Sequence, residues 1–421
     1  MYFLDHMSIY TKIFLAMLAV KMLIQSYLDQ RNQRALNKNK NAVPKLFADQ
    51  ITESDHKKAY LYNTDKIKIG KIFRHINMLI LLFWTMGGGL DLIVSWSSKF
   101  SENEFSQSIF TIIAFSIIST LLQIPMSIYQ TFVIEERHGF NKTTPKIFII
   151  DLLKSGLLSL VISLPLFTGL IYLIENFRDT WWPYAWAGFF GIQFILMWAY
   201  PTFIAPMFNK FTPLDNEELK GGITDMFQRA EFSVKDIFVM DASKRSSHGN
   251  AYFTGFGKNK RIVFFDTLID KLSTNEILAV LAHELGHSKL KHIQKSLVVS
   301  AIFSLILFYG LHLALNGHYF IVGHGLTIPQ TAAIVLQFSL IMPIYLFFLT
   351  PLFNYFSRKN EFEADAFAGK YASAKDLISG LLKLYKYNSG NLVTDELYSA
   401  FYDSHPPATI RINHLMKMEN K

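Results

Sequence analysis

Seven long apolar runs restrict this chain more than any other feature of its sequence. A helix needs about 20 mainly apolar residues to cross a bilayer. Because 51% of the residues are hydrophobic and only 18% are charged, a polytopic membrane protein is predicted rather than a set of soluble domains. The predicted spans are Ile9–Leu28, Ile76–Trp96, Ile109–Phe132, Ile147–Ile174, Tyr184–Pro206, Leu297–Leu315 and Ala332–Phe356.

The distribution of basic residues predicts how these spans are oriented. Lysine and arginine crowd the first loop, recur in the third and fifth loops and in the C-terminal tail, and are sparse in the other loops. By the positive-inside rule, the N-terminus lies outside, and the odd-numbered loops and the C-terminus lie in the cytosol. A nucleic-acid-binding face is excluded because the charge is spread over separate loops. The expected membrane is the endoplasmic reticulum in a eukaryote and the inner or plasma membrane in a bacterium.

Two histidines four residues apart on a predicted helix indicate a metal site. Ser273 and Glu276 have the spacing of a capping box, which starts a helix. His283 and His287 follow on that helix, and their imidazoles leave the same face. Glu284 lies about a third of a turn away, where it can reach a water activated by the metal. This HExxH pattern predicts one zinc ion (Zn²⁺) with Glu284 as general base. The alternative is a pair of solvated histidines.

A third ligand is needed, and the chain has no cysteine to supply it. The best candidate is Glu361, with Asp365 four residues later as the carboxylate that orients a ligand histidine. Glu363 is the rival ligand, but it points to a different helix face. Both this segment and the histidine pair lie close to the last two apolar runs. The site is therefore expected at the cytosolic membrane boundary, with the helix of the histidines continuing into the sixth span.

A predicted hairpin precedes the zinc helix. Asn250–Phe256 and Arg261–Phe265 read as strands, with 257–260 as the turn between them. Its free edge is suited to adding an extended peptide as another strand, although the hairpin can equally serve only the fold.

Near the C-terminus, His405 precedes two prolines in a rigid, non-helical turn. A histidine there can donate to the developing oxyanion of an amide under hydrolysis, and the alternative is an ordinary surface turn.

Six segments together closely resemble the CAAX prenyl protease 1 family, integral-membrane zinc metallopeptidases of peptidase family M48. The resemblance runs from about the second span to the C-terminus, and the segments fall in the family's order. They are HELGH, SRKNEFEADAFAGKYASAKDL, GNAYFTGFGKNKRIVFFDTLI, EERHGFNKTTPK, AYPTFIAPMFNKFTPL and YDSHPP.

The resemblance implies an all-α integral membrane protein whose seven helices form a barrel around a large water-filled chamber. The zinc site faces that chamber, in a cytosolic metalloprotease part that contains the small β-hairpin. The family removes the last three residues of prenylated C-terminal CAAX sequences. Carried over by motif, His283, His287 and Glu361 are ligands and Glu284 is the base, Asn250 and Ala251 with the adjacent Tyr252 contact the substrate, and His405 and Arg411 lie near the transition state.

Two residues depart from the family pattern, and one family segment has no chemistry that sequence can assign. Glu363 stands where Gln is expected, and Asn360 replaces an apolar or aromatic residue. Neither is expected to touch a ligand, so both bear on substrate preference more than on activity. The segment EERHGFN is expected to form a structural network.

The leading interpretation is a zinc endopeptidase that cuts near the C-terminus of a prenylated or membrane-tethered protein, with the bilayer as its other partner. A second is a quality-control protease with no prenyl requirement. A third, a transporter or channel, predicts internal repeats, and none is evident in the sequence. The expected division of the chain is 1–207 for spans one to five with a cytosolic loop at 29–75, 208–296 for the hairpin and zinc helix, 297–356 for spans six and seven, and 357–421 for the segment with the third ligand.

Overall fold

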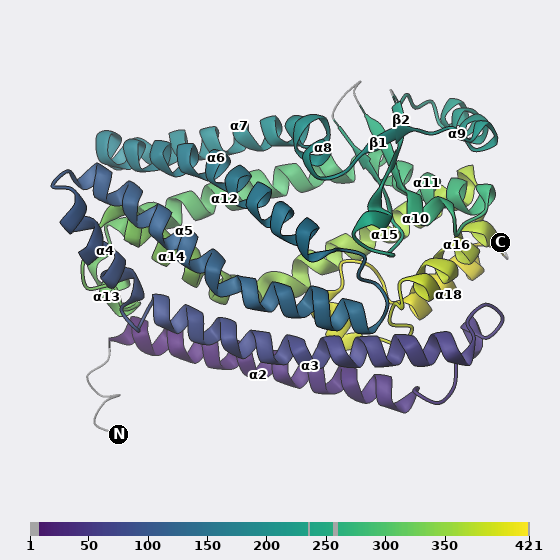
Figure 1. Cartoon of the computed structure of the whole chain (residues 1–421), viewed down its shortest axis with the longest axis horizontal. Coiled ribbons are helices and arrows are strands. Elements are labelled where there is room, and N and C mark those ends of the chain that lie inside the picture. Colours follow the sequence, from purple (N-terminus) through teal and green to yellow (C-terminus); the bar gives the residue numbers. More distant parts are fainter. Residues whose placement is uncertain (1–7, 235, 256–259, 420–421) are drawn as a thin grey trace.

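The computed structural model describes residues 8–234, 236–255 and 260–419. A small sheet with shorter helices lies at one end of the molecule and long helices fill the other end, while the long helices Ile9–Lys38 and Glu53–Trp84 run beside both (Figure 1). The chain is therefore mostly helical, but the sheet has four strands. The prediction of an all-α protein with only a β-hairpin was wrong in that respect.

Among the described residues, five helical regions are long and apolar enough to cross a membrane. They are Ile9–Lys38 (α2), Glu104–Glu135, which contains α5 (Glu104–Tyr129), Pro145–Phe208, His292–Leu315 (α12) and Thr331–Tyr371. A sixth is obtained if α3 (Glu53–Trp84) and α4 (Gly89–Phe100), which meet at 47°, are counted as one broken span. The predicted run Ile76–Trp96 crosses this break. Three consecutive glycines cause it, and Gly88 has a φ of 75°.

The region Pro145–Phe208 contains both the fourth and the fifth predicted runs. Its two main helices are α6 (Pro145–Phe177) and α7 (Trp181–Ala199), followed by the short α8 (Ala205–Phe208). The chain breaks between α6 and α7 at Arg178, whose φ is 42°. The two helices pack against each other and lie side by side in Figure 1.

The long helices turn apolar side chains outward. On α6, Leu153, Leu157 and Val161 recur every four residues and are all exposed. A soluble protein rarely exposes such a stripe, whereas a lipid-facing helix requires one. The chain is a multi-pass membrane protein.

The sheet has the strand order β1-β2-β4-β3. Its strands are β1 (Phe211–Pro213), β2 (Asp236–Met240), β3 (Ala251–Thr254) and β4 (Arg261–Phe265). β3 and β4 pair antiparallel, which confirms the predicted hairpin, and β3 lies at the edge of the sheet. Sequence reasoning missed β1 and β2, which pair antiparallel with each other, while β2 pairs parallel with β4. Positions 256–259, which hold most of the predicted turn, lie outside the described residues.

The histidine helix, α11 (Thr274–Lys289), starts with the predicted capping box. Ser273 and Glu276 satisfy each other's backbone N–H groups. The Glu276 carboxylate also accepts from Ser379, at 2.6 Å, and from Lys383, at 2.7 Å, both on α16 (Ala374–Tyr387). The start of α11 is thereby attached to the C-terminal part of the chain.

The expectation that this helix continues into the membrane was wrong. α11 ends at Lys289, and α12 begins at His292 after a break in which Lys291 has a φ of 60°. Such a conformation is uncommon for a residue other than glycine. The remaining helices are α9 (Glu217–Arg229), α10 (Asp266–Ile269), α13 (His318–Gly323), α14 (Thr331–Leu346), α15 (Thr350–Tyr371), α17 (Glu396–Tyr402) and α18 (Ala408–Glu419).

The EERHGFN segment connects the long helices to the sheet. The carboxylate of Glu135 accepts a hydrogen bond from Tyr62 on α3 at 2.9 Å and lies 3.4 Å from His248, just before β3. Asn141 forms an isolated β-bridge with Ser246. These contacts place the sheet against the ends of the long helices, which is a structural role.

Candidate metal centre and substrate cleft

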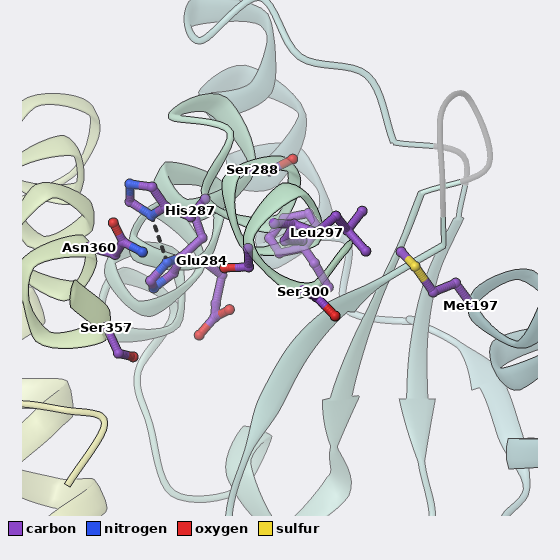
Figure 2. A pocket seen from close by; sticks show the side chains of 12 residues that line it. Met197, Glu284, His287, Ser288, Leu297, Ser300, Ser357 and Asn360 are labelled. Atoms are coloured by element: carbon purple, nitrogen blue, oxygen red, sulfur yellow. Dashed lines mark hydrogen bonds between the residues drawn. The ribbon is translucent and has the colours of Figure 1, made fainter. Parts of the chain in front are cut away.

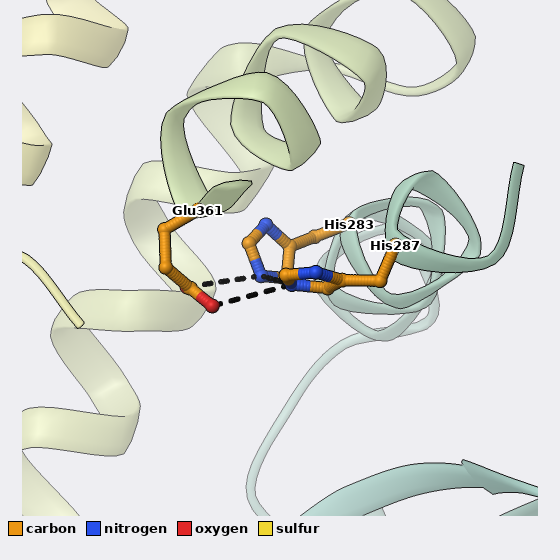
Figure 3. A group of neighbouring side chains, drawn as sticks. All are labelled: His283, His287 and Glu361. Atoms are coloured by element: carbon orange, nitrogen blue, oxygen red, sulfur yellow. Dashed lines mark hydrogen bonds and ion pairs between the residues drawn. The ribbon is translucent and has the colours of Figure 1, made fainter. Parts of the chain in front are cut away.

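His283, His287 and Glu361 converge on one point between α11 and α15 (Figure 3). The Nε2 atoms of the two histidines lie 3.2 Å apart. One carboxylate oxygen of Glu361 lies 3.3 Å from His287, and the other lies 3.4 Å from His283. One ligand atom from each residue lies within 4.8 Å of those of the other two, which is the arrangement expected of three ligands to one ion.

Small residues let these two helices approach closely enough to form the group. A Cβ atom added to Gly286 would lie 3.0 Å from the Cα of Ala364 and 3.1 Å from the Cβ of Phe367, both on α15. Ala364 itself is fully buried. Gly286 lies between the two ligand histidines and Ala364 lies one turn from Glu361, so this contact sets the distance across the metal group.

Gly286→Val is therefore expected to weaken metal binding as well as stability. The added side chain must push α15 away from α11, and overpacking of this kind destabilises by about 1–3 kcal/mol. Retained metal and thermal unfolding in detergent would be measured together. Gly221→Val is the matched control, because a Cβ at that helical glycine meets no atom within 4 Å. Equal effects of the two variants would contradict the close-packing argument.

The three side chains fit a bound cation. Oε2 of Glu361 is buried and has no hydrogen-bond partner among the described residues, and Nη1 of Arg411, at 3.6 Å, is an ion-pair neighbour beyond hydrogen-bond distance. A buried carboxylate oxygen in that state is costly unless a cation satisfies it. Two imidazole nitrogens beside it complete a donor set of nitrogen and oxygen, which suits a divalent metal ion.

Asp365 and Arg411 support the group from behind. Oδ1 of Asp365 lies 2.8 Å from Nδ1 of His283 and accepts from that ring, so Nε2 is the nitrogen that faces Glu361. Nη2 of Arg411 lies 3.2 Å from the same Nε2. Arg411, on α18, donates to both oxygens of Asp365 at 2.7 and 2.9 Å. Asp365 is 0% exposed and Arg411 is 5% exposed, so the two charges neutralise each other inside the protein.

Asp365→Ala is expected to destabilise the protein strongly. It leaves Arg411 buried without its main carboxylate, and breaking a buried ion pair in this way costs about 3–5 kcal/mol. Thermal unfolding in detergent would report the loss, with Asp225→Ala, an exposed aspartate of α9, as the control. A variant that unfolds at the wild-type temperature would show that Asp365 does not compensate Arg411.

Glu284 faces a cavity of about 500 Å³ next to His287 (Figure 2). Burial raises the pKa of the Glu284 carboxyl, while the neighbouring His283 and His287 lower it. A carboxyl group with those opposing influences is suited to accepting a proton from a substrate water. Other lining residues are Met197, Phe253, Ser288, His292, Ile293, Ser296, Leu297, Ser300, Ser357 and Asn360.

The predicted substrate strand lies beside this cavity, but its side chains point in different directions. Phe253 of β3 lines the cavity. Tyr252 is on the opposite face of the strand, where it packs against Met240, Val263 and Phe265. Asn250 is exposed and accepts from the backbone N–H of Ala251 at 2.8 Å. The structure therefore brings the edge of β3 to the cleft, but not the Tyr252 side chain.

His405 reaches the metal group from the turn before α18. Its Nε2 lies 3.4 Å from Oε1 of Glu361, and its Nδ1 lies 3.0 Å from the hydroxyl of Ser404. The side chain is 64% exposed. A residue of the C-terminal turn is thus close to the ligands, with a free face towards solvent.

Sequence reasoning missed His292. It lies five residues after His287, and its Nδ1 is 3.0 Å from Nδ1 of that ligand. The sequence does show a third histidine shortly after HELGH, but on a continuous helix its side chain would point away from His287. The break at Lys291 brings it back. Glu363, expected not to touch a ligand, is 3.1 Å from His292 and therefore connected to the group indirectly.

The long apolar helices and the convergent His–His–Glu group define a membrane-embedded metallopeptidase. Residues 213–419 match the model of peptidase family M48, and residues 32–210 match the model described as CAAX prenyl protease N-terminal, five membrane helices. The chain belongs to the CAAX prenyl protease 1 family, and it is a metalloprotease.

The relatives match over almost their full length. The CAAX prenyl protease 1 homolog of Arabidopsis thaliana is 36% identical, with 93% of this chain and 94% of that protein covered. CAAX prenyl protease 1 of Saccharomyces cerevisiae is 33% identical, with 99% and 98% covered. The crystal structure of S. mikatae Ste24p superimposes with a TM-score of 0.89 at 31% identity, with 96% of this chain and 99% of that chain covered.

Proposed function

We propose that this protein is a zinc endopeptidase that removes the last three residues from prenylated C-terminal CAAX sequences. The observation that carries the proposal is the His283, His287 and Glu361 group, with Glu284 beside it in a cavity next to an edge strand. The names of the relatives, CAAX prenyl proteases, supply the substrate class.

Zinc is the proposed metal because two imidazoles and one carboxylate are a typical catalytic ligand set for it. When bound, zinc polarises the scissile carbonyl and makes water more acidic. Glu284 takes the proton from the attacking water and passes it to the leaving amine. His405 donates to the oxygen on which negative charge develops, since its exposed ring lies beside Glu361. Arg411 supports His283 through Asp365 and also directly, since its Nη2 lies 3.0 Å from Nδ1 of that ring.

The substrate peptide is proposed to bind as an additional strand along β3. Asn250, Ala251 and Tyr252 would contribute backbone groups at the sheet edge, because an extended peptide pairs with the main chain of an edge strand. Phe253 and Glu284 lie on the same cavity, so a peptide held there passes the catalytic base.

We also propose seven spans around a water-filled chamber, with the N-terminus outside and the active site in the cytosol. The six helical regions, one of which holds both α6 and α7, support seven crossings. The division at 207, 296 and 356 is part of this proposal, although α12 begins at His292 and the last helical region, Thr331–Tyr371, runs through residue 356. In a eukaryotic host the membrane would be the endoplasmic reticulum.

The test is a pair of peptides that differ only in a farnesyl group on the CAAX cysteine. Full-length protein in detergent is expected to release the last three residues from the farnesylated peptide, as identified by mass spectrometry, and a chelator should stop the reaction. Equal cleavage of both peptides would overturn the prenyl requirement and favour general proteolysis of membrane proteins. Cleavage of neither, by protein supplied with zinc, would contradict the proposed activity.

A further inference from the structure

His292 and Glu363 are joined to the metal group although neither belongs to it. Nδ1 of His292 lies 3.0 Å from Nδ1 of His287, and its Nε2 lies 3.1 Å from a carboxylate oxygen of Glu363. Both histidines line the cavity of about 500 Å³, whose His287 and Asn360 are labelled in Figure 2. His292 is only 3% exposed, so its ring is fixed between its two partners.

The positions of the hydrogens follow from the two ends of this chain of contacts. A His287 that ligates through Nε2 carries its hydrogen on Nδ1 and donates it from there. Nδ1 of His292 must then accept, which places the hydrogen of that ring on Nε2. Glu363, as a carboxylate, accepts it. Each nitrogen of the two rings therefore has one role, and no donor faces another donor.

The two ligand histidines are thus supported in parallel ways. His283 is held directly by the carboxylate of Asp365, at 2.8 Å, whereas His287 is held by the carboxylate of Glu363 through His292. Both carboxylates come from α15, the helix that also carries the ligand Glu361. The other basic neighbour of Glu363, Lys295, is 4.0 Å away, so His292 is its closer partner.

We infer that Glu363 and His292 form a positioning pair that holds His287 in its ligating tautomer and orientation, and so strengthens zinc binding. The inference rests on the zinc site of the proposed function. Partners of this kind behind a metal ligand typically change metal affinity by about 10- to 100-fold. A neutral glutamine at position 363 would accept a weaker hydrogen bond from His292 than Glu363 does, because hydrogen bonds to charged acceptors are stronger.

The experiment measures the zinc dissociation constant of full-length protein in detergent by competition with a chromophoric chelator. Glu363→Ala and His292→Phe are each expected to raise it by about 10- to 100-fold. The zinc dissociation constant of the double variant should be no higher than that of the weaker-binding single variant, since the two residues act in series. Glu363→Gln keeps an acceptor oxygen, so its zinc affinity should fall less than that of Glu363→Ala. Lys295→Gln is the control and should bind zinc as the wild type does.

A second readout separates positioning from general destabilisation. With cobalt in place of zinc, the visible absorption of Glu363→Ala should differ from that of wild type, because the orientation of His287 has changed. Glu363 is 37% exposed, so its variants test the inference even if His292→Phe does not fold. An unchanged dissociation constant and spectrum in Glu363→Ala would overturn the inference alone. A wild-type chain that binds no zinc would overturn the proposed function as well.

Discussion

Glu284→Gln is expected to lower kcat by about 10³-fold, within the usual range for removal of a general base. The amide has nearly the shape of the carboxylate but cannot take a proton from the attacking water. Glu284 is next to His283 in sequence and lines the cavity, yet it is not one of the three converging ligands. Zinc content should therefore stay at the wild-type level while turnover is lost. Both are measured on the same sample, by metal analysis and by product release from a farnesylated peptide.

The control for this variant is Glu218→Gln, an exposed glutamate on α9 that should leave both quantities unchanged. If Glu284→Gln retained most of its turnover, another group would have to act as the base. If it lost zinc as well as turnover, Glu284 would belong to the ligand set, and the roles assigned to Glu284 and Glu361 would have to be revised.

Glu361→Ala is expected to abolish both tight zinc binding and peptide hydrolysis. It removes the only carboxylate of the three converging ligands and leaves two imidazoles, whereas zinc sites of this kind need three protein ligands. The result would appear as loss of zinc after dialysis and as a turnover no greater than that of chelator-treated wild type. The variant should still fold, because the deleted group is a buried charge that the metal would otherwise neutralise.

Glu218→Ala serves as the control here, since it removes an exposed carboxylate from a helix away from the site. Zinc held by Glu361→Ala as tightly as by wild type would contradict the assignment of the third ligand. The rival from the sequence, Glu363, would then have to be tested in its place.

The parts of the site that sequence predicted are those governed by helical spacing. His283 and His287 are one turn apart, as are Glu361 and Asp365. The structure brings the two histidines and Glu361 to one point, with Asp365 behind His283, because those spacings persist in α11 and α15. The capping box that starts α11 is likewise a local pattern, and it was predicted at the right residues. Local periodicity is sufficient for such features.

The parts that sequence did not predict depend on distant contacts or on unusual backbone conformations. β2 pairs in parallel with β4, a partner about 25 residues away that no turn signal marks. The break at Lys291 requires a positive φ at a lysine, so nothing in the residue type predicts it. That break controls where His292 lies, and the role of Glu363 depends in turn on His292. Because the dihedral angle of Lys291 could not be predicted, the contact of His292 with the ligand His287 could not be predicted either.

We propose that one zinc ion, held by His283, His287 and Glu361, is responsible for peptide hydrolysis. The most direct test is to strip the purified protein with a chelator, add zinc back in small steps, and follow release of the C-terminal tripeptide from a farnesylated peptide. The stripped protein is expected to be inactive, and its activity should return linearly with added zinc until one zinc per chain is bound. Full activity without metal, or an endpoint at two zinc ions per chain, would contradict this proposal.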